Sequence, residues 1–417
     1  MANATFNVSA YTQVRHALLS YGNRSRRSSG SCALGTTAAL RSNTLIAGAK
    51  SAAAGLGKRF GLKKNNAGWT ADRSKNMKSS TGGRSLRAEI YIVNSEGELE
   101  TEEDSIAIPH TQTAWIYKEY GSNEVLSIAE IIVPQVAPDQ VLVKVHASAL
   151  NPVDFKRLIG KFHNSDSELP TVPGYDMAGV VVDVGSEVTK FKVGDRVYGD
   201  VSEHALSPRQ YGSLAQYTAV EEKLIAFIPQ RLNFVEAASL PLAVETAYQS
   251  FEHVSLKEGE TVLVLGGAGG VGSLAVQLAK HVFKASLVAA TTSTPNVDFV
   301  KGLGADVVID YKNEALTDHP NRYDVVLDTV GKGEAAQALK ENGRAIALTG
   351  PVESPVVRFV LTSRGDVLEA LNKFLENGAL KPIIDPAGPF KFSEVVEAFA
   401  YLERGRATGK VVVSPIP

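Results

Sequence analysis

Residues 261–272 read Thr-Val-Leu-Val-Leu-Gly-Gly-Ala-Gly-Gly-Val-Gly, an apolar run that passes directly into a glycine-rich turn. The apolar run predicts a buried strand, and the amphipathic pattern of residues 273–283 predicts a helix after the turn. Gly267, Gly269 and Gly272 match the spacing G-x-G-x-x-G. Glycines at that spacing permit a tight turn, close approach of the backbone to a pyrophosphate, and close packing of helix on strand. Because a helix N-terminus also offers unpaired N–H groups to an anion, the stretch predicts a dinucleotide-binding turn rather than a purely structural one.

Strands and helices alternate on the C-terminal side of this turn. The predicted elements are strands at 286–291, 306–309, 324–328 and 345–349 and helices at 295–303 and 334–341. Alternation at this spacing indicates a parallel sheet covered by helices on both faces, which is an α/β fold of the doubly wound, Rossmann type. We assign residues 238–379 to this predicted domain.

The chain on the N-terminal side of the turn has a different pattern. Between residues 113 and 237, apolar β-branched runs such as 140–147 are separated by Pro and Gly turns. This pattern predicts a small, β-rich, barrel-like domain. Residues 380–417 contain a predicted helix at 392–402 and a predicted strand at 410–413, and we expect them to return to this domain and complete it.

The first 88 residues differ in charge from the rest of the chain. They contain 15 Lys or Arg and one acid, Asp72, whereas the remainder contains 28 basic and 44 acidic residues. A basic segment that is rich in Ser and Ala and almost free of acids is typical of an organelle transit peptide. The alternative is a disordered basic tail that binds an acidic partner. Residues 89–112 are acidic and contain no Lys or Arg, so they are predicted to form a linker.

The composition makes several classes of function improbable. The acidic remainder repels phosphate backbones and anionic lipid, so nucleic acid is not an expected partner. The chain has no run of 18 apolar residues, so no integral membrane segment is expected. The one cysteine, Cys32, lies in the basic segment, so the rest of the chain has no residue for a disulfide or a thiolate metal site.

The residues after the second predicted strand bear on the identity of the dinucleotide. An NAD site usually places Asp or Glu about 20 residues after the glycines, where it binds the ribose 2′-hydroxyl. Here the strand ends in Thr291-Thr292-Ser293-Thr294-Pro295-Asn296, with no acid before Asp298. Hydroxyl and amide groups can donate to a 2′-phosphate, which a carboxylate would repel, so NADPH is the predicted cofactor. The loop itself holds no cation; Lys301 lies further along the predicted helix, and Tyr311 can contribute a phenol.

A dinucleotide-binding domain that follows a β-rich domain resembles the medium-chain dehydrogenase/reductase superfamily. In the alcohol dehydrogenase branch of that superfamily, cysteines and the His of a Gly-His-Glu segment hold a catalytic zinc. The matching segment here is Gly174-Tyr175-Asp176, and Asn151 stands in place of the first zinc cysteine. Because catalytic zinc needs thiolate or imidazole ligands, we predict no metal site and zinc-free chemistry.

Within the superfamily, residues 113–417 resemble the quinone oxidoreductase branch. They are similar to the plant chloroplastic NADPH-dependent alkenal/one oxidoreductases and to the ripening-associated enone oxidoreductases of fruit. The resemblance rests on five stretches: Ala149–Arg157, Leu169–Asp176, Tyr217–Leu224, Leu240–Ala247 and Ala407–Pro417. It implies a GroES-like partial barrel for residues 113–237 and favours the chloroplast stroma as the destination of the basic segment. It also allows a homodimer, because dimers are common in this branch.

The resemblance assigns roles to individual residues. Lys156 is expected beside both cofactor and substrate, and Thr246 near the carboxamide of the nicotinamide. The other expected cofactor contacts form the pyrophosphate turn, the 2′-phosphate site, the nicotinamide lining and a C-terminal closing segment: Gly267, Gly269, Gly270, Val271, Gly272, Ser293, Thr294, Asn296, Tyr311, Leu348, Thr349, Gly350, Phe359, Val360, Arg406 and Ala407. Two features depart from the family. Asn296 stands where relatives often have Lys, and the loop 350–357 differs in sequence.

The implied reaction is NADPH-dependent reduction of the C=C bond of a small α,β-unsaturated carbonyl, a 2-alkenal or an enone, which would detoxify lipid-derived carbonyls. Reduction at the β-carbon builds enolate charge on the carbonyl oxygen, and this charge needs a donor. Lys156 and Asn151 are the candidate donors, and water, Tyr175 or Tyr217 could protonate the α-carbon. A surface role for Lys156 and packing roles for the two tyrosines are the structural alternatives. The alternative functions are a quinone reductase with the same pocket and a non-catalytic NADPH-binding protein.

Overall fold

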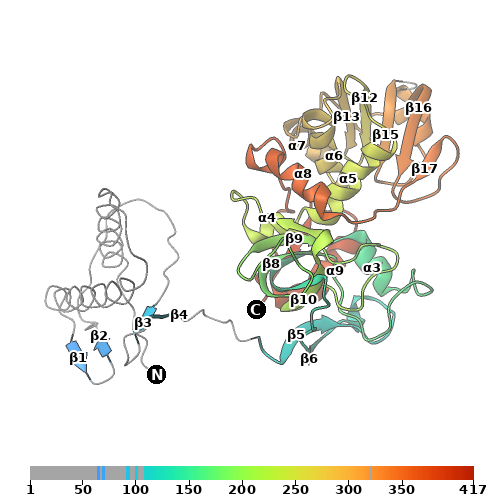
Figure 1. Ribbon diagram of the computed structural model, residues 1–417. Coiled ribbons are helices and arrows are strands. Elements are labelled where there is room, and N and C mark those ends of the chain that lie inside the picture. Colours follow the sequence, from blue (N-terminus) through green and yellow to red (C-terminus); the bar gives the residue numbers. More distant parts are fainter. Residues whose placement is uncertain (1–62, 66–67, 71–90, 94–98, 102–107, 320–321) are drawn as a thin grey trace, which may run out of the picture. The chain divides into compact units, whose positions relative to one another are not determined.

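The computed structural model describes residues 63–65, 68–70, 91–93, 99–101, 108–319 and 322–417 (Figure 1). The chain divides into two compact units, residues 1–107 and 108–417. Two short antiparallel hairpins are described in the first unit: β1 (Lys63–Asn65) with β2 (Gly68–Thr70), and β3 (Tyr91–Val93) with β4 (Leu99–Thr101). Apart from these strands, the predicted transit peptide lies outside the described residues, and of the predicted acidic linker 89–112 only residues 108–112 are described as well.

A parallel sheet of six strands forms around the glycine-rich turn. In order across the sheet, its strands are β14 (Val307–Asp310), β13 (Leu287–Thr292), β12 (Thr261–Leu265), β15 (Tyr323–Asp328), β16 (Leu339–Ala347) and β17 (Val356–Arg358). Numbered from β12, this is the order 3-2-1-4-5-6 of the Rossmann fold, and the predicted fold is confirmed. The strand order reverses between β12 and β15, and ligands of such sheets bind at the carboxyl ends of the strands at that point.

Helices and single 3-10 turns connect these strands. They are α5 (Pro241–His253), α6 (Gly270–His281), η3 (Thr294–Asn296), α7 (Val297–Gly302), η4 (Leu316–Asp318), η5 (Ala335–Ala338) and α8 (Gly365–Glu376). Alternate residues of β12 enter different core clusters, because successive side chains of a strand point to opposite faces. Val262 and Val264 pack with α5, α6 and α8. Leu263 and Leu265 pack in a second cluster that includes η5.

One predicted helix of this sheet is wrong. Residues 334–341 form only the 3-10 turn η5, and Leu339 already pairs with Tyr323 at the start of β16. Leu339 is also buried in the second core cluster. Sheet pairing and burial therefore outweigh the helical propensity of the local sequence. Helix α5, in contrast, had no counterpart among the predicted elements, because it is buried along most of its length and lacks a wide polar face.

An antiparallel sheet forms the β-rich part of the chain. Its strands, in order, are β10 (Tyr217–Glu221), β7 (Gln140–Leu150), β8 (Asp176–Val184), β9 (Arg196–Asp200) and β11 (Ile225–Phe227). β18 (Val411–Val413) pairs with the end of β7, so the C-terminal residues return to this sheet. A hairpin of β5 (Thr111–Ile116) and β6 (Ser127–Ile132) joins it through a bridge between Ala114 and Ala215.

Short helices complete this part: η1 (Asn123–Val125), α3 (Pro152–Leu158), η2 (Glu222–Leu224), α4 (Phe234–Ala238), η6 (Phe392–Glu394) and α9 (Val395–Glu403). Helix α3 begins directly after β7, the longest strand of the sheet. The backbone N–H of Asn151 donates to Asp154 Oδ2 at 2.7 Å, and Pro152 occupies the first helical position. Both features favour a helix start here, and they fix the helix that carries Lys156.

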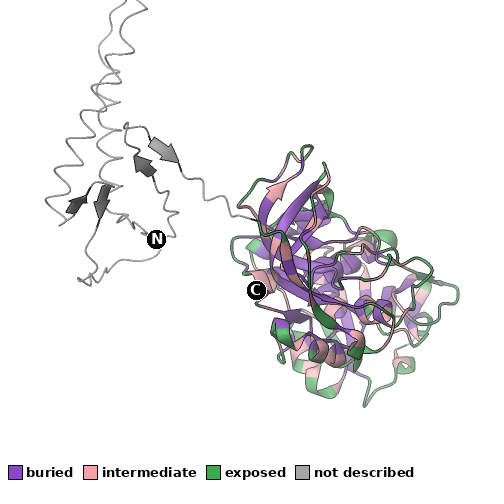
Figure 2. Cartoon of the chain, turned by 90° about the horizontal axis from the view of Figure 1, so that it is seen from below, coloured by how far each residue is buried: buried purple, intermediate pink, exposed green. Residues whose placement is uncertain are grey.

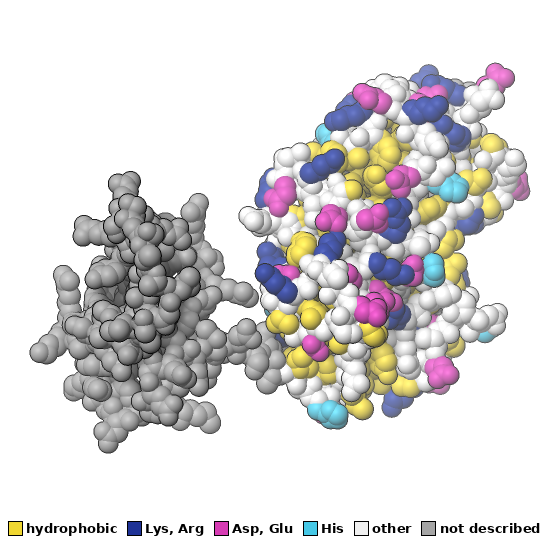
Figure 3. Space-filling model, viewed as in Figure 1, with side chains coloured by type: hydrophobic (Ala, Val, Ile, Leu, Met, Phe, Trp, Pro, Cys, Tyr) yellow, Lys and Arg dark blue, Asp and Glu magenta, His cyan; other side chains and the backbone are white. Residues whose placement is uncertain are grey.

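Burial follows this architecture. In Figure 2 the strands of residues 108–417 are mainly buried, and exposed residues lie on the outer faces of the helices and on loops. Basic and acidic side chains are interspersed over the face seen in Figure 3. Within the described residues, no helix combines the length and the apolar character needed to cross a bilayer.

Candidate active site

Packing explains two of the three pattern glycines in the turn after β12. A Cβ atom on Gly267 would lie 2.7 Å from the Cβ of Ala290, and one on Gly272 would lie 2.0 Å from the carbonyl oxygen of Gly266. Both distances are too short for a real side chain. Gly266 itself has a φ of +84°, a left-handed conformation that favours glycine. The turn therefore holds α6 tightly against β12 and β13.

Gly269 is not required by packing. A Cβ atom there would meet nothing closer than the Gly266 carbonyl oxygen at 3.6 Å, which is an ordinary contact. Its φ of −76° suits any residue. The open space lies at the N-terminus of α6, where the first N–H groups of the helix have no intrahelical partner. These residues fit a pyrophosphate, which needs close approach of the backbone at this glycine.

The C-terminal segment between α9 and β18 lies against the same turn. Gly409 forms an isolated bridge with Gly269, and its N–H donates to the Ala268 carbonyl at 2.9 Å. Gly409 has a φ of +81°, and a Cβ there would lie 2.5 Å from the Ile383 carbonyl oxygen. The segment that contains Arg406 and Ala407 is therefore attached to the turn at Gly409.

The ammonium group of Lys410 binds two buried side chains of the antiparallel sheet. Lys410 Nζ lies 2.8 Å from Asp176 Oδ2 and also donates to Asn151 Oδ1. Asn151 Nδ2 donates to the same Asp176 oxygen at 2.8 Å. None of the three side chains is more than 4% exposed. Asn151 thus uses its amide oxygen and one of its two amide N–H groups within this triad, and the side chain is buried.

Three more carboxyl groups are buried around this triad. Burial is the main cause that raises the pKa of Asp154 to about 7 and the pKa of Asp200 to about 8, and the charge of Asp176 contributes to both shifts. Burial also raises the pKa of Glu245 well above its usual range. Asp200 is therefore mainly uncharged at neutral pH. The ammonium group of Lys410 forms an ion pair with Asp176 and so balances the charge of that carboxylate directly.

Lys156, on α3, reaches across to the parallel sheet. Its Nζ donates to Thr349 Oγ1 at 3.4 Å, and Thr349 lies in the loop that follows β16. Burial lowers the pKa of Lys156, and the neighbouring charges of Lys161 and Arg358 lower it further. The structure thus brings Lys156 together with one of the residues expected to line the nicotinamide.

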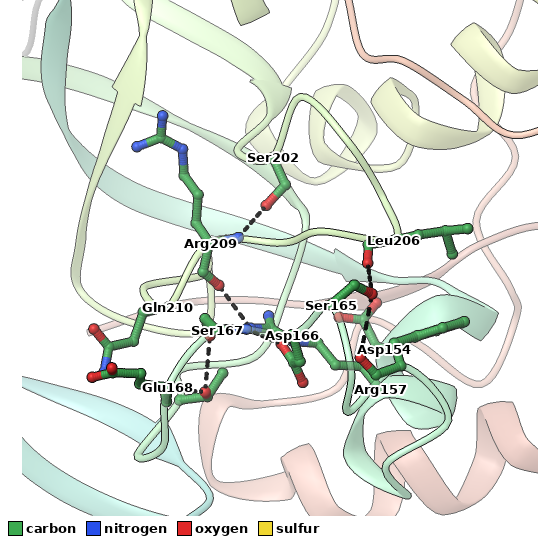
Figure 4. A network of polar contacts seen from close by, with 12 residues as sticks. Asp154, Arg157, Ser165, Asp166, Ser167, Glu168, Ser202, Leu206, Arg209 and Gln210 are labelled. Atoms are coloured by element: carbon green, nitrogen blue, oxygen red, sulfur yellow. Dashed lines mark hydrogen bonds and ion pairs between the residues drawn. The ribbon is translucent and has the colours of Figure 1, made fainter.

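A buried arginine fixes the other side of α3 (Figure 4). Arg157 Nε lies 2.7 Å from Asp166 Oδ1, and its Nη2 donates to Ser167 Oγ and to the carbonyl oxygen of Arg209, both at 2.8 Å. The Arg157 side chain is only 2% exposed. A pair this buried depends on all of its hydrogen bonds. It joins three segments of the β-rich part and restricts the position of the adjacent Lys156.

The two candidate tyrosines are packed in the core. Tyr175 is fully buried, and its hydroxyl donates to the Ala205 carbonyl oxygen at 2.9 Å. Burial raises the pKa of Tyr175 well above its usual range. Tyr217 is buried with Val133 and Leu142. Among the residues that the structure describes, no group of three or more His, Cys, Asp or Glu side chains is arranged to hold a metal ion.

The expected nicotinamide lining lies at the carboxyl ends of β15 and β16. The N–H of Leu348 donates to the Asp328 carbonyl at 3.0 Å. Gly350 has a φ of +73°, and a Cβ there would lie 1.9 Å from the Gly331 carbonyl oxygen, so the two loops touch. The N–H of Phe359 donates to the Ala347 carbonyl at 3.2 Å, which continues the edge of β16. Val360 is half exposed, and Thr246 is buried on α5.

The expected 2′-phosphate site lies at the carboxyl ends of β13 and β14. The N–H of Tyr311 donates to the Thr292 carbonyl at 3.1 Å and so places Tyr311 beside the loop that begins at Ser293. Two lysine ammonium groups, of Lys312 and Lys332, each lie 5.6 Å from the centre of the Tyr311 ring. The loops after β14 and β15 therefore place two cations beside Tyr311, whereas the loop 293–296 contains no Lys or Arg.

The sequence patterns did not single out Lys332 or Lys410. Lys332 follows β15 and comes near Tyr311 only through the strand order of the sheet. Lys410 appears in a stretch that carries the family resemblance, but its partners lie more than 230 residues away. Its position next to a predicted buried strand was the one available signal, because a lysine there needs a buried partner.

Comparison with known proteins defines the class first. The family model described as an alcohol dehydrogenase GroES-like domain matches residues 137–230, and the model described as a zinc-binding dehydrogenase matches residues 303–413. Among solved structures, the quinone oxidoreductase from Coxiella burnetii superposes with a TM-score of 0.65 at 31% identity, covering 73% of this chain and 99% of that one. The fold is that of a medium-chain dehydrogenase/reductase, which binds a nicotinamide dinucleotide.

Curated relatives narrow the class. The chain is 59% identical over 316 residues to 2-methylene-furan-3-one reductase from Solanum lycopersicum. It is 56% identical over 314 residues to the chloroplastic NADPH-dependent alkenal/one oxidoreductase from Arabidopsis thaliana. Each alignment covers 75% of this chain and 81% of the relative. The chain therefore belongs to the plant enone and alkenal oxidoreductases of the medium-chain dehydrogenase/reductase superfamily.

Proposed function

We propose that this chain uses NADPH to reduce the C=C bond of small α,β-unsaturated carbonyls, namely 2-alkenals and enones. The observation that carries the proposal is the contact between Lys156 Nζ and Thr349 Oγ1, which places an ammonium group at the carboxyl ends of the parallel strands. The names of the two relatives at 59% and 56% identity support the substrate class.

The chain's residues fit a reduced nicotinamide dinucleotide, which supplies a hydride when bound. Gly269, Gly270 and the start of α6 would hold the pyrophosphate, because the space beside Gly269 is open and the first N–H groups of a helix have no partner within the helix. The nicotinamide would be held by residues of α3, α5 and the loop after β16, and the 2′-phosphate by the loops after β13 and β14. The lack of an acid before Asp298 supports NADPH over NADH.

Lys156 is proposed as the donor to the substrate's carbonyl oxygen. That oxygen gains negative charge as the β-carbon is reduced, and a fixed donor aimed at growing charge lowers the barrier. Partial burial strengthens such an interaction, because less water screens it. The lowered pKa of Lys156 also makes its ammonium a better proton donor than an exposed lysine.

Asn151 and Tyr175 are proposed to act through their neighbours. Asn151 is the N-cap residue of α3, and its side chain binds Asp176 and Lys410. It would therefore position the helix that carries Lys156. Tyr175 holds the Ala205 carbonyl and is packed against Leu242. The Tyr175 hydroxyl is bound to the Ala205 carbonyl and both side chains are buried, which supports water as the source of the proton at the α-carbon.

The proposed setting is the chloroplast stroma, where the enzyme would remove reactive lipid-derived carbonyls. Two relatives, from Arabidopsis thaliana at 56% identity and from Spinacia oleracea at 34% identity, carry the word chloroplastic in their names. We further propose zinc-free chemistry, since Tyr175 and Asn151 replace ligands that zinc requires. We also propose two domains: a GroES-like domain of residues 113–237 with 380–417, and a cofactor-binding domain of residues 238–379. A homodimer is part of the same proposal.

The test is to follow NADPH oxidation by the purified chain with a short enone, a 2-alkenal and a quinone. The proposal expects turnover of the enone and the alkenal, with the saturated carbonyl as product. A second candidate, quinone reduction, is favoured by the fold shared with the Coxiella burnetii quinone oxidoreductase. Turnover of the quinone alone would establish that candidate instead. Binding of NADPH without turnover of any of the three would indicate a non-catalytic binding protein.

A further inference from the structure

The loop after β13 is an incomplete site for a 2′-phosphate. It offers hydroxyl and amide groups from Ser293, Thr294 and Asn296 but no positive charge. A phosphate monoester carries close to two negative charges at neutral pH, and sites for it usually include Lys or Arg. If NADPH is the cofactor, as proposed above, the balancing charge must come from another part of the chain.

The loop after β15 supplies a well-fixed lysine. Asp328 Oδ1 accepts hydrogen bonds from the N–H groups of Val330 and Gly331, both at 2.8 Å. Gly331 and Gly333 have φ values of +81° and +79°, so the backbone on both sides of Lys332 follows a turn that favours glycine. The loop is thus ordered by its own hydrogen bonds and directs Lys332 toward Tyr311.

The two ammonium groups converge on the Tyr311 ring from different loops. Lys332 Nζ and Lys312 Nζ each lie 5.6 Å from the ring centre. Tyr311 is 46% exposed, so a ligand can reach the ring. Within the part of the chain that the structure describes, neither ammonium lies within 4.0 Å of a carboxylate. A cation near an aromatic ring at an exposed site gains only about 0.5 to 1 kcal/mol, so a phosphate can readily recruit it.

An acid in the same turn, Asp310, already accepts several hydrogen bonds. Asp310 ends β14, and its carboxylate accepts from the Lys312 N–H at 3.0 Å and from Asn313 Nδ2 at 2.7 Å. The carboxylate also accepts from the side chain of Thr294, which lowers the pKa of Asp310, so a negative charge lies beside the loop 293–296 and a 2′-phosphate there needs a balancing cation. The two lysines therefore form a positive pair beside the phenol that the 2′-phosphate site is expected to use.

We propose that Lys332, together with Lys312, supplies the positive charge for the 2′-phosphate of NADPH, because the loop that contains Asn296 has no cation of its own. This inference rests on the proposed function. It makes Lys332 a residue that determines cofactor specificity, and it predicts that NADPH selectivity weakens as salt rises, because exposed charges are screened.

The test uses two fragments that lack the nicotinamide and differ by one phosphate: adenosine 2′,5′-bisphosphate and 5′-AMP. Their Kd values are measured by calorimetry with the wild type, Lys332→Ala, Lys312→Ala and Lys332→Arg. We expect each alanine variant to weaken the bisphosphate about fivefold and to leave 5′-AMP within about twofold. Lys332→Arg should keep most of the affinity. Lys257→Ala is the matched control, because this exposed lysine precedes β12, at the amino ends of the parallel strands rather than their carboxyl ends.

A second variant separates charge from structure. Asn296→Lys, added to Lys332→Ala, should restore bisphosphate binding, because it returns a cation to the same phosphate. Unchanged bisphosphate affinity in both alanine variants, or equal weakening of the two fragments, overturns the inference. Either result leaves the reductase proposal standing, because that proposal is tested by turnover. A wild type that reduces none of the three substrates contradicts the proposed function even if the fragments bind as expected.

Discussion

Lys156 Nζ donates to Thr349 Oγ1 at 3.4 Å and so joins helix α3 of the antiparallel part to the loop after β16 of the parallel sheet. The contact lies at the carboxyl ends of the parallel strands, where sheets of this kind bind their ligands. Arg157, the next residue of α3, is anchored to Asp166. The position of the ammonium is therefore set by a rigid support.

Lys156→Met should lower kcat for an enone about a hundredfold, because a donor to the developing enolate is lost. The Kd for NADPH should change less than about threefold, since most cofactor contacts remain. Steady-state kinetics and a fluorescence titration measure the two effects. Lys118→Met, at an exposed lysine after β5, is the control. A kcat close to that of the wild type would remove Lys156 from the mechanism.

Gly269 and Gly272 should respond differently to alanine. A Cβ at Gly272 would lie 2.0 Å from the Gly266 carbonyl oxygen, so Gly272→Ala should lower the melting temperature by several degrees. Gly269→Ala should leave the melting temperature nearly unchanged and weaken NADPH about tenfold or more, because its methyl group occupies the space for the pyrophosphate. Thermal unfolding and cofactor titration of both variants give the answer. Tight NADPH binding by Gly269→Ala would place the pyrophosphate elsewhere.

The buried pair of Lys410 and Asp176 should matter for stability. Asp176→Ala leaves the ammonium buried without its partner, and we expect a loss of about 3 to 5 kcal/mol in the free energy of unfolding. Glu369→Ala breaks the exposed pair with Lys190 and should cost less than about 1 kcal/mol. Urea unfolding of both variants makes the comparison. Similar losses in the two would show that burial of the Lys410 pair is unimportant.

Asp200 should give the fold a distinct dependence on pH. Its pKa in the folded protein is about 8, against an ordinary value of 3.8, because burial disfavours the charged form. The folded state therefore binds the proton more strongly, and the contribution of Asp200 to stability is lost as pH rises from about 4 to about 8. Asp200→Asn keeps an acceptor for Ser363 and removes the titration. Relative to wild type, its unfolding free energy should fall less steeply across this range, and parallel curves would contradict the assignment.

The glycine turn and the strands beside it could be predicted from sequence because their causes are local. Consecutive residues predict an apolar strand, a glycine turn and an amphipathic helix, and the structure contains this strand and helix as β12 and α6. The segment 334–341 failed for the opposite reason. Its pairing partner, Tyr323, and its core neighbours lie on other strands, and no local pattern shows them.

The candidate site divides in the same way. Lys156 was expected from the family resemblance, and the structure adds its partner Thr349. Asn151 was predicted to act on the substrate. The structure adds that its amide nitrogen donates to Asp176 and that its amide oxygen accepts from Lys410, near the other end of the chain. Lys332 reaches Tyr311 through the order of the strands. Contacts between residues so distant in sequence depend on the fold as a whole.

The most direct test of the proposed C=C reduction is to identify the carbon atom that receives the hydride. The purified chain is incubated with a 2-alkenal and NADPH that carries deuterium at the transferable C4 position, and the product is examined by mass spectrometry and NMR. We predict a saturated aldehyde with deuterium on the β-carbon. Deuterium on the former carbonyl carbon of an unsaturated alcohol, or no transfer of label to the alkenal, would contradict the proposal.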